Sequence, residues 1–154
     1  MGTKAKELVG LNVDELITEL NKAYADEWLA YYQYWIAAKT LTGRGSIMLA
    51  KELERIAEEE LEHAEELAER ILMLGGKPLV TPKAWFEETN CGYSEPPEDQ
   101  EGVIRMVIEA EQCAIEVYER LAKKTLQGDP ITYELMLHIL EEELEHEDTF
   151  ENLI

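Results

Sequence analysis

Two histidines in this sequence follow a glutamate by three positions, inside identical hexapeptides. The segment 58–63 reads EEELEH, and the segment 141–146 repeats it 83 residues later. Side chains at positions i and i+3 share one face of a helix, so each Glu-x-x-His pair can offer a carboxylate and an imidazole to one metal ion. Glutamate is abundant in this chain, so either motif alone is equally compatible with a solvated acidic helix that carries a surface histidine.

The apolar pattern around the motifs favours a metal site over a solvated face. Four stretches of the chain carry apolar residues at helical spacing, and ionisable residues interrupt each apolar stripe. The interrupting residues are Glu27, Glu60, His63, Glu111, Glu143 and His146. Burying a lone carboxylate is costly. Four buried carboxylates and two imidazoles in one cluster would be badly destabilising unless a metal balanced their charge.

Sparse glycines and prolines divide the chain into four expected helices. Residues 13–41 contain neither glycine nor proline and follow Asn12, which we expect to be an N-cap. A second helix is expected over 46–74, a third from about 98 to 126, and a fourth from Pro130 to the last few residues. Gly128 is expected at the C′ position of the third helix, and Asp129 as the N-cap of the fourth. Residues 75–97 contain four of the five prolines and predict a long loop with a short turn near Trp85.

The helix lengths place the ionisable residues at one level. Glu27 and Glu60 are equally far along the chain from the first tight turn, and Glu111 and Glu143 are equally far from the second. At 1.5 Å per residue, that level lies about 20 Å from each bend. The segment 75–97 is long enough to cross the bundle lengthwise, which makes the second and third helices parallel. The sequence therefore predicts an all-α fold: one domain over residues 1–154, a four-helix bundle with a long crossover between helices two and three.

Four glutamates and two histidines in this arrangement form the ligand pattern of a di-iron carboxylate site. Glu60 and Glu143 are expected to bridge two metals, with Glu27 and Glu111 as terminal carboxylates and one histidine on each metal. Carboxylates combined with imidazoles suit iron or manganese and leave positions open for an oxidant. We therefore expect two iron ions per subunit, with manganese as the alternative. His138 has no such surroundings in the sequence and is expected to be an ordinary helix residue.

These motifs resemble the ferritin-like superfamily over nearly the whole chain. Bacterioferritins carry a glutamate on helix one, a Glu-x-x-His, another glutamate and a second Glu-x-x-His, which match the six residues above. Tyr34 matches their tyrosine beside the site. Leu61 stands where bacterioferritins place a haem-ligating methionine, so the resemblance implies no haem.

Within this superfamily, the chain resembles the Dps-like group called thioferritins. The sequence ends eight residues after His146, so we expect no fifth helix of the ferritin type. Thioferritins carry one cysteine in the long connection and one on helix three, and Cys91 and Cys113 match both positions. The resemblance implies a redox-active or structural cysteine pair; a buried, small apolar role for Cys113 is the alternative.

The resemblance also implies a function. We expect a ferroxidase that oxidises Fe(II) with hydrogen peroxide or dioxygen and stores ferric oxide in a homo-oligomeric cage of 12 subunits, protecting against oxidative stress. Tyr34 would hydrogen-bond a ligand or supply an electron. One alternative is a rubrerythrin-like di-iron or di-manganese peroxide reductase without storage. The other alternative is a purely structural bundle or a helical protein that binds a partner.

Charge and hydropathy exclude several other classes of protein. The chain carries 14 Lys and Arg against 34 Asp and Glu, a formal charge of −20. A field of that sign repels phosphate backbones and attracts cations, so DNA is disfavoured as a partner. No uninterrupted apolar stretch approaches the ~18 residues of a membrane span, and the N-terminus lacks the apolar core of a secretory signal. We therefore expect a cytoplasmic protein that does not contact membranes.

Overall fold

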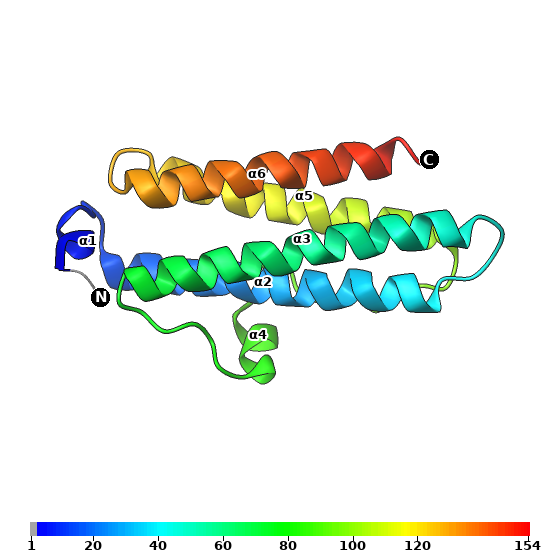
Figure 1. Cartoon of the computed structure of the whole chain (residues 1–154), viewed down its shortest axis with the longest axis horizontal. Helices are drawn as coiled ribbons and strands as arrows, with labels where there is room; N and C mark the ends of the chain where they lie inside the picture. The colour runs from blue at the N-terminus through cyan, green and yellow to red at the C-terminus, as the bar shows by residue number, and fades with distance from the viewer. Residues whose placement is uncertain (1–2) are drawn as a thin grey trace.

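Four long helices form the body of the molecule (Figure 1). The computed structural model describes residues 3–154. Its elements are α1 (Thr3–Glu7), α2 (Val13–Thr40), α3 (Ser46–Met73), α4 (Pro82–Glu88), α5 (Gln100–Thr125) and α6 (Pro130–Glu151). Helix α2 pairs with α3 and helix α5 pairs with α6, so the bundle consists of two hairpins side by side. The predicted all-α bundle is confirmed.

Polar side chains cap the helices where the sequence predicted it. Asn12 accepts a hydrogen bond from the backbone N–H of Glu15 at 3.1 Å, and Asp129 accepts one from Thr132 at 3.1 Å. Helix α5 begins at Gln100 rather than at residue 98, because Asp99 is its N-cap and accepts a hydrogen bond from the N–H of Gly102. Capping of this kind satisfies backbone donors that the first helical turn leaves free.

Gly128 does not serve as the C′ glycine that the sequence predicted. Its backbone does not take the positive φ typical of a C′ glycine, whereas Gly43, Gly45 and Gly75 do. Gly128 instead lies against the N-terminal segment, where its carbonyl accepts a 2.7 Å hydrogen bond from the N–H of Gly10. A Cβ at Gly128 would lie 2.5 Å from Cγ of Leu11, so close packing is what favours glycine here.

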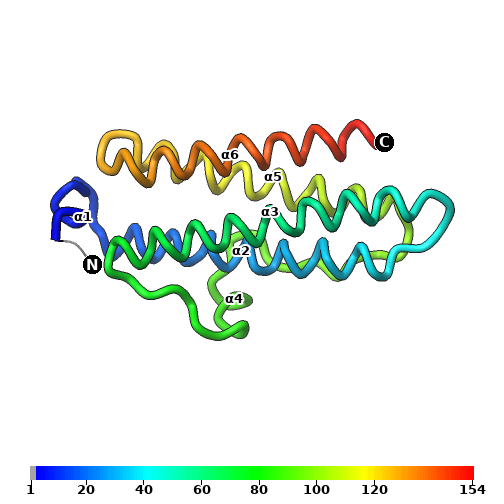
Figure 2. The backbone as a smooth tube through the Cα atoms, viewed as in Figure 1, coloured from blue at the N-terminus to red at the C-terminus, as the bar shows by residue number. Residues whose placement is uncertain are grey.

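The long connection crosses the bundle lengthwise, as predicted (Figure 2). It leaves the end of α3 and arrives beside the α2–α3 turn, where the N–H of Thr42 donates to the carbonyl of Glu98 at 3.0 Å. Helices α3 and α5 therefore run parallel. On the way the chain forms α4, a short helix at the predicted turn, whose Trp85 stacks on Trp28 of α2 with ring centroids 4.9 Å apart. The short helix α1 was not predicted.

The apolar core is split into two clusters along the bundle axis. One cluster contains Leu20 and Ile71, and the other contains Leu53 and Phe150. On every long helix, the ionisable residues predicted to form a site fall between the two clusters. No helix among residues 3–154 combines the length and hydropathy needed to cross a bilayer.

Candidate metal centre

All six residues predicted from the sequence meet in the middle of the bundle. Helix α2 contributes Glu27 and α5 contributes Glu111, while α3 and α6 each contribute a Glu-x-x-His pair. None of the six side chains is more than 2% exposed. They form two overlapping groups whose ligand atoms lie within 4.8 Å of one another. The groups are Glu27, Glu60, His63 and Glu143, and Glu60, Glu111, Glu143 and His146.

Glu60 and Glu143 belong to both groups and divide their oxygens between the two histidines. Glu60 places Oε2 3.4 Å from Nδ1 of His63 and Oε1 3.4 Å from Nδ1 of His146. Glu143 places Oε1 and Oε2 3.3 Å from the same two nitrogens. Each of these two carboxylates therefore lies between the two groups, with one oxygen toward each histidine.

Glu27 and Glu111 each belong to one group only. Oε2 of Glu27 lies 3.6 Å from Nδ1 of His63, and Oε2 of Glu111 lies 3.6 Å from Nδ1 of His146. Each histidine therefore faces three carboxylates, two shared and one its own. Atoms 3.3–3.6 Å apart can all bind one cation, since metal–ligand distances are about 2.0–2.2 Å.

The donor atoms that face the centre lack protein partners. Nδ1 of both histidines, Oε1 of Glu60 and both oxygens of Glu143 are buried without a hydrogen bond from residues 3–154. Buried polar atoms are normally paired, because leaving one unsatisfied costs about 1–3 kcal/mol. Five such atoms pointing into one centre fit bound cations, and two divalent cations would neutralise the four carboxylates.

Protonation shows how the cluster balances its charge without a cation. Burial raises the pKa of Glu27 well above its ordinary value, and the charges of Glu60 and Glu143 raise it further. The pKa of Glu111 is raised for the same reasons. Burial alone would lower the pKa of His63, but the surrounding carboxylates, with Glu143 foremost, outweigh burial and raise it. The cluster thus retains protons that cations would displace.

Glu59 and Glu142 are functional candidates that the sequence prediction missed. Nε2 of His63 donates to Oε2 of Glu142 at 2.6 Å, and Nε2 of His146 donates to Oε2 of Glu59 at 2.6 Å. A proton held on Nε2 leaves Nδ1 to face the centre as the ligand nitrogen. The repeat could have revealed the pair, because each of the two glutamates directly precedes a glutamate that belongs to both groups. The other glutamates in EEELEH obscure this signal.

Two tyrosines donate hydrogen bonds to Glu111 and Glu27, each from the other hairpin. Tyr34 donates to Oε1 of Glu111 at 2.6 Å, and Tyr118 donates to Oε1 of Glu27. Tyr34 was expected beside the site, whereas Tyr118 was not among the predicted site residues. A shift of 84 residues relates both the two tyrosines and the two glutamates, so this signal was present in the sequence.

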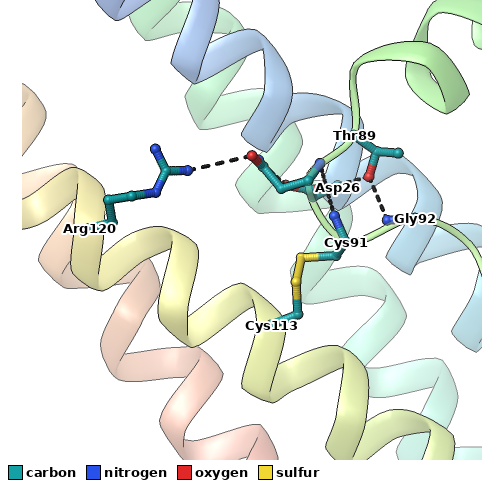
Figure 3. The surroundings of a disulfide bond; sticks show 7 residues. Asp26, Thr89, Cys91, Gly92, Cys113 and Arg120 are labelled. Atoms are coloured by element: carbon teal, nitrogen blue, oxygen red, sulfur yellow. Dashed lines mark hydrogen bonds between the residues drawn. A yellow bond between two sulfur atoms is a disulfide. The ribbon is translucent and has the colours of Figure 1, made fainter.

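A disulfide fastens the crossover to the bundle beside this centre (Figure 3). Cys91 and Cys113 are joined, with their Cα atoms 5.9 Å apart. Asp26, buried next to Glu27, accepts hydrogen bonds from the backbone N–H of Cys91 at 3.0 Å and from the side chain of Thr89. The loop is therefore attached to α5 by the disulfide and to α2 by the hydrogen bonds to Asp26.

A cavity of about 250 Å³ lies between this loop and the centre. Both cysteines line it, and so do four carboxylates of the centre, those of Glu27, Glu60, Glu111 and Glu143. Its volume far exceeds the ~15 Å³ needed for one water molecule. The cavity therefore opens onto the carboxylates from the disulfide side.

Removing the disulfide should lower stability without removing the centre. The bond closes a loop of 22 residues, and cross-links over loops of about this length contribute about 3 kcal/mol. We expect Cys91→Ser/Cys113→Ser to lower the free energy of unfolding by about that amount, measured by urea denaturation at fixed chain concentration. Reduced wild type is the matched control and should lose the same amount. An unchanged midpoint in both would contradict this role.

Comparison with known proteins agrees with the geometry. A sequence model of the ferritin-like domain matches residues 17–154. The chain belongs to the ferritin-like family. Among curated relatives of this ferritin-like chain, a DNA protection during starvation protein of Pyrococcus furiosus is 35% identical over 150 residues, covering 96% of this chain and 81% of the relative. A bacterioferritin of Desulfovibrio desulfuricans is 33% identical over 140 residues, covering 90% and 74%.

A solved structure resembles the ferritin-like chain over almost its full length. The bacterioferritin-related protein of Bacteroides fragilis, a dodecameric thioferritin, superimposes with a TM-score of 0.95 at 38% identity. The match covers 98% of this chain and 92% of the other. The predicted resemblance to this group is confirmed.

Proposed function

We propose that this ferritin-like protein is a ferroxidase that binds two Fe(II) ions per chain as substrate. The observation that carries the proposal is the sharing of Glu60 and Glu143 between two four-residue groups, each completed by its own histidine and terminal glutamate. Two shared carboxylates hold two metals close together, so both can deliver an electron to one oxidant. Manganese could occupy the same donors.

The reaction balances between two Fe(II) ions, the oxidant and two protons taken from solvent. Two Fe(II) ions give up one electron each, and hydrogen peroxide takes both electrons and two protons to yield two molecules of water. Dioxygen would take the same two electrons and two protons to yield hydrogen peroxide. The cavity beside the disulfide supplies the route for either oxidant, and the acidic chain attracts the cation.

Storage in a cage is the second part of the proposal. The similarity to a dodecameric thioferritin supports a homo-oligomer of 12 subunits that retains ferric oxide. Leu61 at the position of the haem-ligating methionine supports a chain without haem, and the charge of −20 disfavours DNA as a partner. A location in the cytoplasm and the organisation of residues 1–154 as one domain stay predictions.

Anaerobic loading with Fe(II), followed by peroxide, tests the proposal. Colour reports oxidation, and sedimentation reports the size of the particle that holds the iron. We expect rapid oxidation and retention of many irons per chain in a cage-sized particle. Oxidation limited to two irons per chain in a small oligomer would contradict storage and favour a rubrerythrin-like reductase. No oxidation beyond the protein-free rate would contradict the ferroxidase itself.

We propose that Tyr34 orients Glu111 through its hydrogen bond and can donate an electron. Tyr34→Phe removes the hydrogen bond to Oε1 of Glu111 while keeping the ring. We expect about 10-fold weaker metal binding at one position, the lower end of the effect of losing an outer partner of a ligand. Titration with Co(II) measures this. When only one Fe(II) is bound, Tyr34 would supply the second electron that peroxide takes, so wild type loaded with one Fe(II) per chain should show a tyrosyl radical in stopped-flow spectra that Tyr34→Phe lacks. Unchanged affinity and spectra would contradict both roles.

A further inference from the structure

The cavity beside the metal centre is larger than hydrogen peroxide or dioxygen requires. Its volume is about 250 Å³, whereas an engineered apolar cavity of about 150 Å³ is enough to bind benzene. Either small oxidant is little larger than a water molecule, whose share of the liquid volume is about 30 Å³. The remaining space is therefore large enough for an organic group attached to the oxidant.

The cavity lies between α2 and α5, under residues 91–94 of the crossover. Its apolar wall is formed by Ala30 of α2 and by Met106, Ala110 and Ala114 of α5. The three residues of α5 are spaced by four, so they share one face of the helix. Carboxylates of the centre line the same cavity. One ligand can therefore contact the apolar wall and the metal-binding oxygens together.

Gln33 gives the cavity a neutral polar group. Its side chain is 4% exposed and lines the cavity. Oε1 of Gln33 accepts a 2.7 Å hydrogen bond from the backbone N–H of Ser94, which orients the amide and leaves its N–H groups to donate to a ligand. An apolar wall with a few oriented polar groups is the usual lining of a site for a small organic molecule.

The mouth of the cavity favours an uncharged ligand. Gly92, Ser94 and Glu109 line the cavity and are exposed, so the cavity reaches solvent there. The carboxylate of Glu109 and the formal charge of −20 on the chain repel anions. A neutral molecule with a short alkyl group enters without this repulsion.

We propose that the cavity binds small neutral alkyl hydroperoxides and that these compounds oxidise Fe(II) at the centre. The alkyl group packs against the alanines and Met106, and the O–O bond lies beside the carboxylates. This inference rests on the proposed ferroxidase function and names the class of its oxidising substrate.

The reaction with an alkyl hydroperoxide balances in the same way as that with hydrogen peroxide. Two Fe(II) ions give up one electron each, the O–O bond breaks, and two protons from solvent complete one molecule of alcohol and one of water. Cys91 and Cys113 do not supply the electrons, because their sulfurs are already joined in the disulfide. The two oxidants therefore differ only in the group that contacts the apolar wall.

Oxidation of anaerobically loaded Fe(II) by tert-butyl hydroperoxide, compared with hydrogen peroxide, tests the proposal. We expect the KM for tert-butyl hydroperoxide to be at least ~10-fold lower, since each buried CH₂ group adds about fourfold to affinity. Ala110→Leu narrows the cavity, so it should lower the ratio of kcat/KM for tert-butyl hydroperoxide to that for hydrogen peroxide at least ~10-fold. Ala50→Leu is the matched control, because Ala50 is a half-buried alanine of α3 that does not line the cavity. It should leave the ratio unchanged.

Met106→Ala makes the opposite change to the same wall. The wider cavity should raise kcat/KM for the bulkier cumene hydroperoxide about 10-fold. A gain in this variant and a loss in Ala110→Leu cannot both come from damaged folding, so the pair isolates the size of the cavity. An unchanged ratio in Ala110→Leu together with no gain in Met106→Ala would overturn the proposal.

Binding of the alkyl group can be measured without iron. Saturation-transfer NMR with tert-butanol, the product, should detect contact with the metal-free wild type and lose most of the signal in Ala110→Leu. Equal signals, or oxidation by hydrogen peroxide but not by tert-butyl hydroperoxide, would overturn the inference and leave the ferroxidase intact. No oxidation by either peroxide would instead refute the proposed function, while the tert-butanol signal would still report binding in the cavity.

Discussion

Glu60→Ala is expected to abolish tight binding of both metals and to slow Fe(II) oxidation by more than ~100-fold, above the range found for losing an outer partner of a ligand. The reason is that Glu60 gives one oxygen to each histidine's group, so its loss damages both positions at once. The initial rate of Fe(III) formation and the stoichiometry of Co(II) binding measure the two effects.

Glu27→Ala provides the matched comparison, because Glu27 belongs to only one group. This variant should keep one tight metal per chain and lose the other. Glu62→Ala, an exposed position two residues after Glu60, should behave as wild type. Equal losses in Glu27→Ala and Glu60→Ala would contradict the assignment of Glu60 as a bridge.

Loading the protein with two divalent cations should raise its thermal stability strongly. Each site filled at 100 times its dissociation constant adds about 2.7 kcal/mol, so two sites add about 5 kcal/mol. For a chain of this length, that corresponds to a rise in Tm of about 10–20 °C. Calorimetry with and without Co(II) measures the shift, and Glu60→Ala is the control that should show little of it. Equal shifts in both would contradict stabilisation through the buried centre.

The contribution of three buried groups to the stability of the metal-free protein should decrease as pH rises. The pKa values of Glu27, Glu111 and His63 are raised in the folded protein, so folding takes up protons. Their stabilising contribution is complete below the unfolded values, 4.5 for glutamate and 6.5 for histidine, and is lost as pH rises through the folded values.

Metal binding should release these protons. His146 also has a raised pKa, so two glutamates and two histidines together would release about four protons per chain. Calorimetry in buffers of different ionisation enthalpy counts them. Release of no protons would contradict displacement at these residues.

The sequence predicted much of the centre because helical periodicity and the internal repeat constrain each other. Four carboxylates on apolar stripes, at equal distances from two turns, could meet only in one layer once the crossover made α3 and α5 parallel. Glu59 and Glu142 were missed because neither interrupts an apolar stripe and glutamates surround them. Tyr118 was missed because a tyrosine fits an apolar run, and only its contact with Glu27 reveals its polar role.

Contacts between distant segments account for the other differences. The role of Gly128 depends on Leu11, more than 100 residues away, so no local pattern contains it. Asp26 anchors the crossover through the backbone of Cys91, which sequence spacing does not specify.

Anomalous diffraction from crystals soaked anaerobically with Fe(II) tests the central claim most directly. The account predicts two iron peaks per chain about 3.5–4 Å apart, the separation typical of two-metal sites. Both peaks should lie among the six buried residues, with Glu60 and Glu143 contacting both. A single peak in the centre, or iron confined to the acidic surface, would contradict it.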